Sequence, residues 1–208
     1  MSNTDNEVLQ FVIDNDVKFI RLAFCDVYGT LKNISIMAEE LPRAFEYGVA
    51  FDAGLVDGFA DLPRADLVLH PDASTLEVLP WRPQTGRVAR FYCDITTGEG
   101  EPFEQDGRQI LRRALQALLE EGYTARVGAK CAFYLFRLDE NGDPTPIPHD
   151  RAGFLDVAPL DRGENVRRDI CLTLEEMGIR SLSSHHEMGP GQNEISIAPA
   201  DPMTAANH

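Results

Sequence analysis

Apolar residues in this chain come in short runs, and this feature limits the possible fold more than any other. The longest purely apolar run in the middle of the chain, residues 131–136, has six residues. A membrane-spanning helix needs about 20 consecutive apolar residues, so we expect no membrane span and no membrane partner. Short apolar runs bounded by glycine and proline are typical of β-strands. The sequence therefore predicts a fold of short strands and amphipathic helices.

The first half of the chain is typical of a small sheet with few helices. We expect helices at residues 3–15 and 39–47, and strands at residues 17–24, 31–36, 67–69, 76–79 and 88–95. Tyr28 and Gly29 supply turn chemistry between the first two strands, which predicts a hairpin. Gly48 ends the second helix. These elements together resemble a grasp-like sheet.

The second half begins with the clearest helix of the chain. Asp106 is a candidate N-cap with Gln109 three residues later, an apolar stripe follows, and Gly122 ends the helix. We expect this stripe to pack in a core. A second helix is predicted at residues 164–177 and strands at residues 127–137, 179–184 and 193–197, with an irregular stretch up to about residue 163. The architecture predicted for the whole chain is α+β in two layers.

The charge of the chain excludes one class of partner. Nineteen basic and 34 acidic side chains give 208 residues a formal charge of −15. Binding to nucleic acid through overall charge needs a basic face, so we expect no nucleic-acid partner. The N-terminus is acidic and polar, unlike a secretory signal, and the four cysteines are scattered without a CxxC pair. These features predict free thiols and a cytoplasmic protein.

Residues 185–194, with the sequence HHEMGPGQNE, concentrate side chains that bind metals. The glycines allow a tight turn, so Glu187 and Glu194 can converge on one point. Magnesium prefers oxygen ligands and usually takes one or two carboxylates. His-His-Glu sequences also occur on ordinary surface loops, and the local pattern leaves both interpretations open. We expect His185 and His186 to be structural or to support the carboxylates.

The wider sequence places this block in a series of further segments. They are residues 51–59, 65–72, 79–81, 93–95, 102–103, 127–128 and 133–136. In this order, and with the HHE-x-GPGQ-x-E block, they closely resemble the N-terminal part of bacterial type I glutamine synthetases. The resemblance runs from about Val17 to the end of the chain.

The resemblance implies a fold and a reaction. The expected fold is a grasp-like N-terminal β domain, residues 1–100, followed by the first part of a glutamine synthetase-type catalytic α/β domain, residues 101–208. The family makes glutamine from L-glutamate, ammonia and ATP with Mg²⁺ or Mn²⁺, through γ-glutamyl phosphate. Its active sites lie between neighbouring subunits of a stacked double ring, which implies a homo-oligomer or association with synthetase subunits.

The resemblance also assigns roles to three residues. Glu187 and Glu194 correspond to metal ligands. Asp52, in a segment similar to the F-D-G-S-S-I loop of the family, corresponds to a catalytic residue that holds and deprotonates ammonium in a neighbouring site. A carboxylate stabilises an adjacent cation, which is consistent with these roles.

Several positions depart from the family pattern. After Gly128 the family has P-E-x-E-F, but Lys130 and Ala132 stand at the two glutamate positions. Residues two apart on a strand face the same side, so we expect a cation to replace a ligand there and metal binding to be weak or absent. Leu182 also stands where many relatives have a glutamate near the nucleotide, and Ala53-Gly54-Leu55 differs from the loop around Asp52.

The chain is less than half as long as a usual family member, so three origins stay open: a fragment, a degenerate reading frame or a functional short protein. We predict that this chain alone is incomplete and inactive as a glutamate–ammonia ligase. The alternative, from another class, is a non-catalytic interaction protein that associates with or modulates full-length synthetase subunits. A third hypothesis replaces ammonia with a polyamine, since some relatives ligate glutamate to polyamines.

Overall fold

The computed structural model describes residues 3–59 and 66–208 of the chain. Ala65, the first residue of one family-like segment, lies outside the described residues. The chain forms two compact units, Met1–Ala125 with Asn207, and Arg126–Ala206 with His208. No helix in the described part of the chain is long and apolar enough to cross a membrane.

The first unit is built on a six-stranded sheet. Its main path runs β2-β1-β6-β4-β3, and β5 pairs with β6. The strands are β1 (Val17–Cys25), β2 (Leu31–Met37), β3 (Val49–Asp52), β4 (Asp66–Pro71), β5 (Glu77–Val78) and β6 (Arg87–Thr97). β1 and β2 form the predicted antiparallel hairpin, while β1 and β6 run parallel. The parallel pair is long-range and was not predicted.

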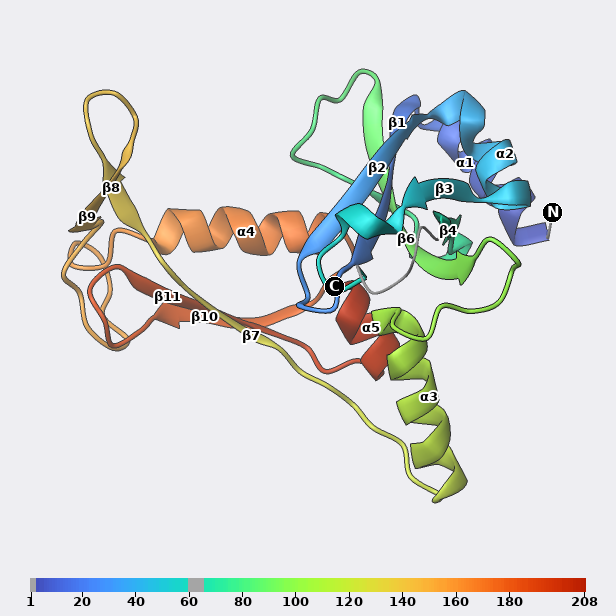
Figure 1. The fold of residues 1–208 in the computed structure, drawn as a ribbon. Coiled ribbons are helices and arrows are strands. Elements are labelled where there is room, and N and C mark those ends of the chain that lie inside the picture. The colour runs from blue at the N-terminus through green and yellow to red at the C-terminus, as the bar shows by residue number, and fades with distance from the viewer. Residues whose placement is uncertain (1–2, 60–65) are drawn as a thin grey trace. The chain divides into compact units, whose positions relative to one another are not determined.

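Two helices cover one face of this sheet, α1 (Asn3–Asp14) and α2 (Leu41–Tyr47) (Figure 1). Alternate residues of β4 and β6 are buried, as expected where one face of a sheet packs against helices. The core includes Leu22, Leu67 and Phe91 from the strands and Leu41 from α2, each fully buried. Short 3₁₀ helices at Ala38–Glu40, Ala53–Leu55 and Ala73–Thr75 connect the elements.

Helix α3 (Gly107–Glu120) begins where the sequence predicts. The carboxylate of Asp106 accepts hydrogen bonds from the amides of Arg108 and Ile95, so it caps the helix and ties it to β6. Arg108 and Arg112 also form ion pairs with Asp94 on β6. The expectation of core packing for the apolar stripe is wrong in this structure: α3 has no buried residue, and Leu119 is 59% exposed.

The second unit contains a three-stranded sheet of order β10-β11-β7, with both pairs antiparallel. Its strands are β7 (Lys130–Tyr134), β10 (Ser181–His186) and β11 (Gln192–Ile197), and helix α4 (Glu164–Glu176) packs along β10 and β11 (Figure 1). A separate hairpin joins β8 (Phe136–Leu138) to β9 (Pro144–Pro148). The prediction of irregular chain across residues 144–148 is therefore wrong. The short helix α5 (Pro202–Asn207) was also not predicted.

Candidate active site

The HHEMGPGQNE block forms the connected ends of β10 and β11. His185 pairs with Glu194 across the two strands, and the amide of Glu187 donates to the Gln192 carbonyl at 2.8 Å. Gly191 has φ of +69° at the turn, and a Cβ there would lie 2.6 Å from the Leu135 carbonyl oxygen. Only glycine tolerates both conditions without a shift of the backbone. The turn thus brings the two glutamates onto one site.

Three side chains gather at this site. Ligand atoms of His185, Glu187 and Glu194 all lie within 4.8 Å of one another. His185 Nε2 lies 3.1 Å from Glu187 Oε1. The Met188 amide and then His185 bind the Glu187 carboxylate, and together they lower its pKa below the usual value. The two glutamates are close together, as the sequence predicts; their role as metal ligands stays a prediction.

Strand β7 adds two further residues to the same face. Ala132 lies directly opposite Glu194 and Lys130 opposite Ser196, so all four residues share one face of the sheet. The Lys130 Nζ atom lies 3.0 Å from Glu194 Oε1. Lys130 and Ala132 therefore face the same side, as the sequence predicts, and Lys130 faces the acidic cluster.

A divalent ion does not fit this donor set. A cation bound through Glu194 would share that carboxylate with the Lys130 ammonium, which already contacts it. Two like unit charges about 4 Å apart repel by about 4 kcal/mol at an effective dielectric constant near 20, and a divalent ion doubles the repulsion. Ala132 offers no oxygen to offset this. The chemistry of these residues disfavours Mg²⁺ or Mn²⁺ bound between them.

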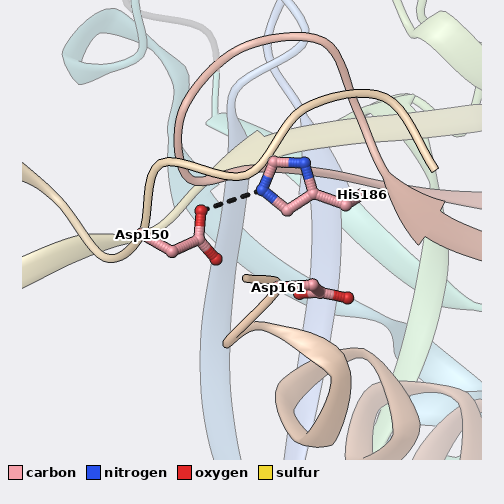
Figure 2. A group of neighbouring side chains, drawn as sticks. All are labelled: Asp150, Asp161 and His186. Carbon is pink, nitrogen blue, oxygen red and sulfur yellow. Dashed lines mark hydrogen bonds and ion pairs between the residues drawn. The ribbon is translucent and has the colours of Figure 1, made fainter. Parts of the chain in front are cut away.

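A second group of titratable side chains is buried behind the candidate site. Figure 2 shows Asp150, Asp161 and His186, all buried in the second unit. His186 Nε2 lies 2.9 Å from Asp150 Oδ1, and its Nδ1 lies 2.7 Å from the Glu187 carbonyl oxygen. A carboxylate and a carbonyl both accept hydrogen bonds, so this arrangement favours the protonated ring, in which both nitrogens donate. Burial is the largest single influence on the pKa of His186 and lowers it, but the hydrogen bonds to Asp150 and the Glu187 carbonyl and the charges of Asp150 and Asp161 together raise it above its usual value.

Arg167 on α4 completes this group. Its guanidinium bridges both oxygens of Asp161, at 3.2 and 2.6 Å, and donates to the side-chain oxygen of Asn193, a fully buried residue beside Glu194. Bidentate arginine–carboxylate pairs are strong and fix geometry. We call Asp150, Asp161, Arg167, His186 and Asn193 the buried polar network. It holds residues that immediately flank Glu187 and Glu194.

Sequence reasoning missed most of the buried polar network. Asp150 and Asp161 lie in irregular chain, where no periodicity marks a buried side chain. Arg167 did leave a signal, because it lies three residues before Ile170 and seven before Leu174, on the apolar face of α4. A charged residue on such a face must be paired when buried. That rule could have singled out Arg167.

Asp52 belongs to the first unit, at the end of β3. Its Oδ1 accepts the Gly54 amide at 2.9 Å and so caps the short 3₁₀ helix that follows. Oδ2 makes no hydrogen bond within the described part of the chain. The residue is exposed and is held in one orientation, but nothing in the chain tests its predicted role with ammonium.

Comparison with known proteins gives the family. Residues 16–98 match the family described as "Glutamine synthetase, beta-Grasp domain", and residues 104–208 match "Glutamine synthetase, catalytic domain". The chain belongs to the glutamine synthetase family. The predicted α+β fold, with a grasp-like domain and part of the catalytic domain, is confirmed.

Individual members of the family agree with this assignment. A glutamine synthetase from Clostridium saccharobutylicum is 45% identical over 205 residues, 99% of this chain and 46% of that protein. One from Methanosarcina mazei is 43% identical over the same shares of each chain. A solved Plasmodium falciparum glutamine synthetase superposes with a TM-score of 0.81 at 22% identity, over 99% of this chain and 46% of that one. The chain thus spans about half the length of these relatives.

We predict that Arg167 is essential to the stability of the second unit. Arg167→Met leaves the buried Asp161 carboxylate with the Gly163 amide but without its charged partner, which should cost about 3–5 kcal/mol. The neighbouring Arg168, whose side chain is 66% exposed, provides the control, and Arg168→Met should change stability by less than about 0.5 kcal/mol. Hydrogen exchange of the β11 amides reports the local free energy of opening. Equal effects of the two substitutions would contradict the prediction.

Asp150 should make the stability of this unit depend on pH in the acidic range. Burial raises its pKa, but hydrogen bonds from the Arg162 amide, His186 and the Gly191 amide outweigh burial and lower the pKa to about 2. The folded carboxyl therefore contributes stability above its unfolded pKa, and this is lost as the pH falls through about 2. Urea unfolding of the wild type and Asp150→Asn should differ most near neutral pH and converge below about pH 4. A constant difference down to about pH 2 would show that Asp150 does not titrate as described.

Proposed function

We propose that this chain is a glutamine synthetase-family polypeptide whose parent reaction is the ATP-dependent ligation of ammonia to L-glutamate, and that it does not complete this reaction alone. The observation that carries the family reaction is the 45% identity to a glutamine synthetase over 205 residues. The observation that argues against independent activity is the contact between Lys130 and Glu194. ATP and Mg²⁺ or Mn²⁺ are the cofactors of the parent reaction.

The contributions of individual residues follow from their surroundings. Asp52, fixed by the Gly54 amide and exposed, could attract an ammonium ion through its free carboxylate oxygen. Glu187 and Glu194 supply negative charge at the ends of β10 and β11. We propose no step through a metal ion, because Lys130 and Ala132 leave the donor set unsuited to one.

The remaining expectations for this chain are proposals of the same kind. We propose a cytoplasmic protein without a membrane or nucleic-acid partner, supported by the formal charge of −15. The family matches end at residue 98 and begin again at residue 104, which supports a family-domain boundary near residue 100, whereas the compact units divide after Ala125, so that α3 belongs to the first unit. Assembly into a homo-oligomer or with synthetase subunits is supported by family membership.

A non-catalytic role in association with synthetase subunits is the second candidate function. Apolar side chains on three elements stay exposed: Ile110 and Leu119 on α3, Leu172 on α4 and Leu182 on β10. Each Å² of apolar surface removed from water contributes about 25 cal/mol, so covering several such side chains favours association. The chain spans 46% of the Clostridium relative, and a synthetase subunit or its other half would present matching surfaces.

The proposed lack of activity can be tested directly. Purified chain supplied with L-glutamate, ammonia or hydroxylamine, ATP and Mg²⁺ or Mn²⁺ should form no glutamine or γ-glutamyl hydroxamate above the blank. The physical reason is the cation at Glu194 and the missing oxygen ligand at Ala132. Turnover that scales with the amount of chain and disappears in Glu187→Ala would contradict the proposal.

Association should be visible in solution. We expect self-association at tens of micromolar, or a stable mixed assembly after co-expression with a full-length glutamine synthetase, measured by size-exclusion chromatography with light scattering. Leu119→Glu should weaken it, because it places charge on an exposed apolar position of α3. Gln116→Glu, exposed on the polar face of α3, is the control. A monomer indifferent to any partner would rule out the second candidate function.

A further inference from the structure

Glu194 is nearly buried, with 8% of its surface exposed, and it carries a carboxylate. A buried charge must be compensated, usually by an opposite charge or a metal ion. Within the described part of the chain, its charged partner is Lys130, whose ammonium lies 3.0 Å away. Ser196 Oγ adds a weaker contact at 3.4 Å to the same oxygen.

We propose that the Lys130 ammonium takes the place of a divalent cation at the His185, Glu187 and Glu194 cluster, so that this part of the fold forms without metal. The strand register fixes the arrangement, since Lys130 and Ala132 lie on the face of β7 that meets Glu194. Two carboxylates and one ammonium leave a single net negative charge here. A single net negative charge is too small to bind a divalent ion in competition with its hydration by water.

The exposure of Lys130 and Glu194 shows how an ammonium can replace a metal ion here. The side chain of Lys130 is 70% exposed, while that of Glu194 is 11% exposed. The ammonium therefore approaches from solvent, as a hydrated ion would, on a flexible stem anchored to β7. Such a tether keeps the cation at high local concentration without any metal in solution. Because the lysine is exposed, removing it should unmask the carboxylates rather than unfold the strand.

A basic side chain also balances the carboxylates in the other cluster of metal-binding residue types that the described residues contain. Asp150, Asp161 and His186 also lie within the reach of a metal ion. There, too, a basic side chain fills the position, because Arg167 binds both oxygens of Asp161. In this unit, basic side chains of the chain itself balance both groups of carboxylates.

The inference rests on the proposed function, because the family reaction identifies Mn²⁺ as the probe. Its test measures metal binding and unfolding instead of glutamine synthesis, so the inference and the proposed function can fail separately. Thermal unfolding of the purified chain is measured in EDTA and in millimolar Mn²⁺, and Mn²⁺ binding by calorimetry. The wild type should unfold at the same temperature in both solutions. Lys130→Met should bind Mn²⁺ at least tenfold more tightly and should be stabilised by it, because ligand binding to the folded state raises stability.

Three matched variants locate the effect. Lys130→Arg keeps a cation and should behave as the wild type. Arg168→Met removes an exposed positive charge from α4 and should not create a response to Mn²⁺. Glu187→Gln added to Lys130→Met should abolish the new response. The proposal is overturned if Mn²⁺ stabilises the wild type as much as Lys130→Met, or if it stabilises Arg168→Met as much as Lys130→Met. If Lys130→Met folds poorly, the unfolding temperature of the wild type in EDTA and in Mn²⁺ still decides.

Discussion

The register of β11 is the constraint on which the candidate site depends. Its backbone hydrogen bonds place Glu194 opposite His185 on β10 and opposite Ala132 on β7. Side chains alternate between the faces of a strand, so a slip of one residue would turn Glu194 away from the cluster. Asn193, bound by Arg167, and Ile195, only 2% exposed, lie on the opposite face and oppose such a slip. The buried polar network thus sets where the carboxylates of Glu187 and Glu194 lie.

Arg167 and Lys130, both in the second unit, balance charge in different ways. Arg167 is buried and bidentate, and its planar guanidinium fixes Asp161 in one geometry. Lys130 makes one contact from a flexible, exposed stem. Breaking the first pair strands two buried charged groups, whereas breaking the second strands only the Glu194 carboxylate, because the Lys130 ammonium is open to water. Fold and site chemistry therefore depend on different residues within this unit.

The sequence predicted those parts of the structure that rest on local patterns. The Asp106 cap, the hairpin of β1 and β2 and the convergence of Glu187 with Glu194 follow from spacing and from glycine turns. The parallel pairing of β1 with β6 depends on contacts distant in sequence, and β9 contains three prolines in five residues, which hid it. Asp150 and Asp161 are buried by tertiary packing around them, which no local pattern encodes.

These observations separate what the family fold requires from what its chemistry requires. Asp161, Arg167 and Asn193 are buried, and a change in any of them leaves a polar partner unsatisfied inside the protein. Lys130 and Ala132 are exposed on β7, so changing them leaves no cavity in the core, and Lys130 acts on the fold through the charge that it balances on Glu194. This chain keeps the glutamine synthetase fold with an ammonium facing its carboxylates. The ammonium occupies the carboxylate oxygen that a divalent ion would need free.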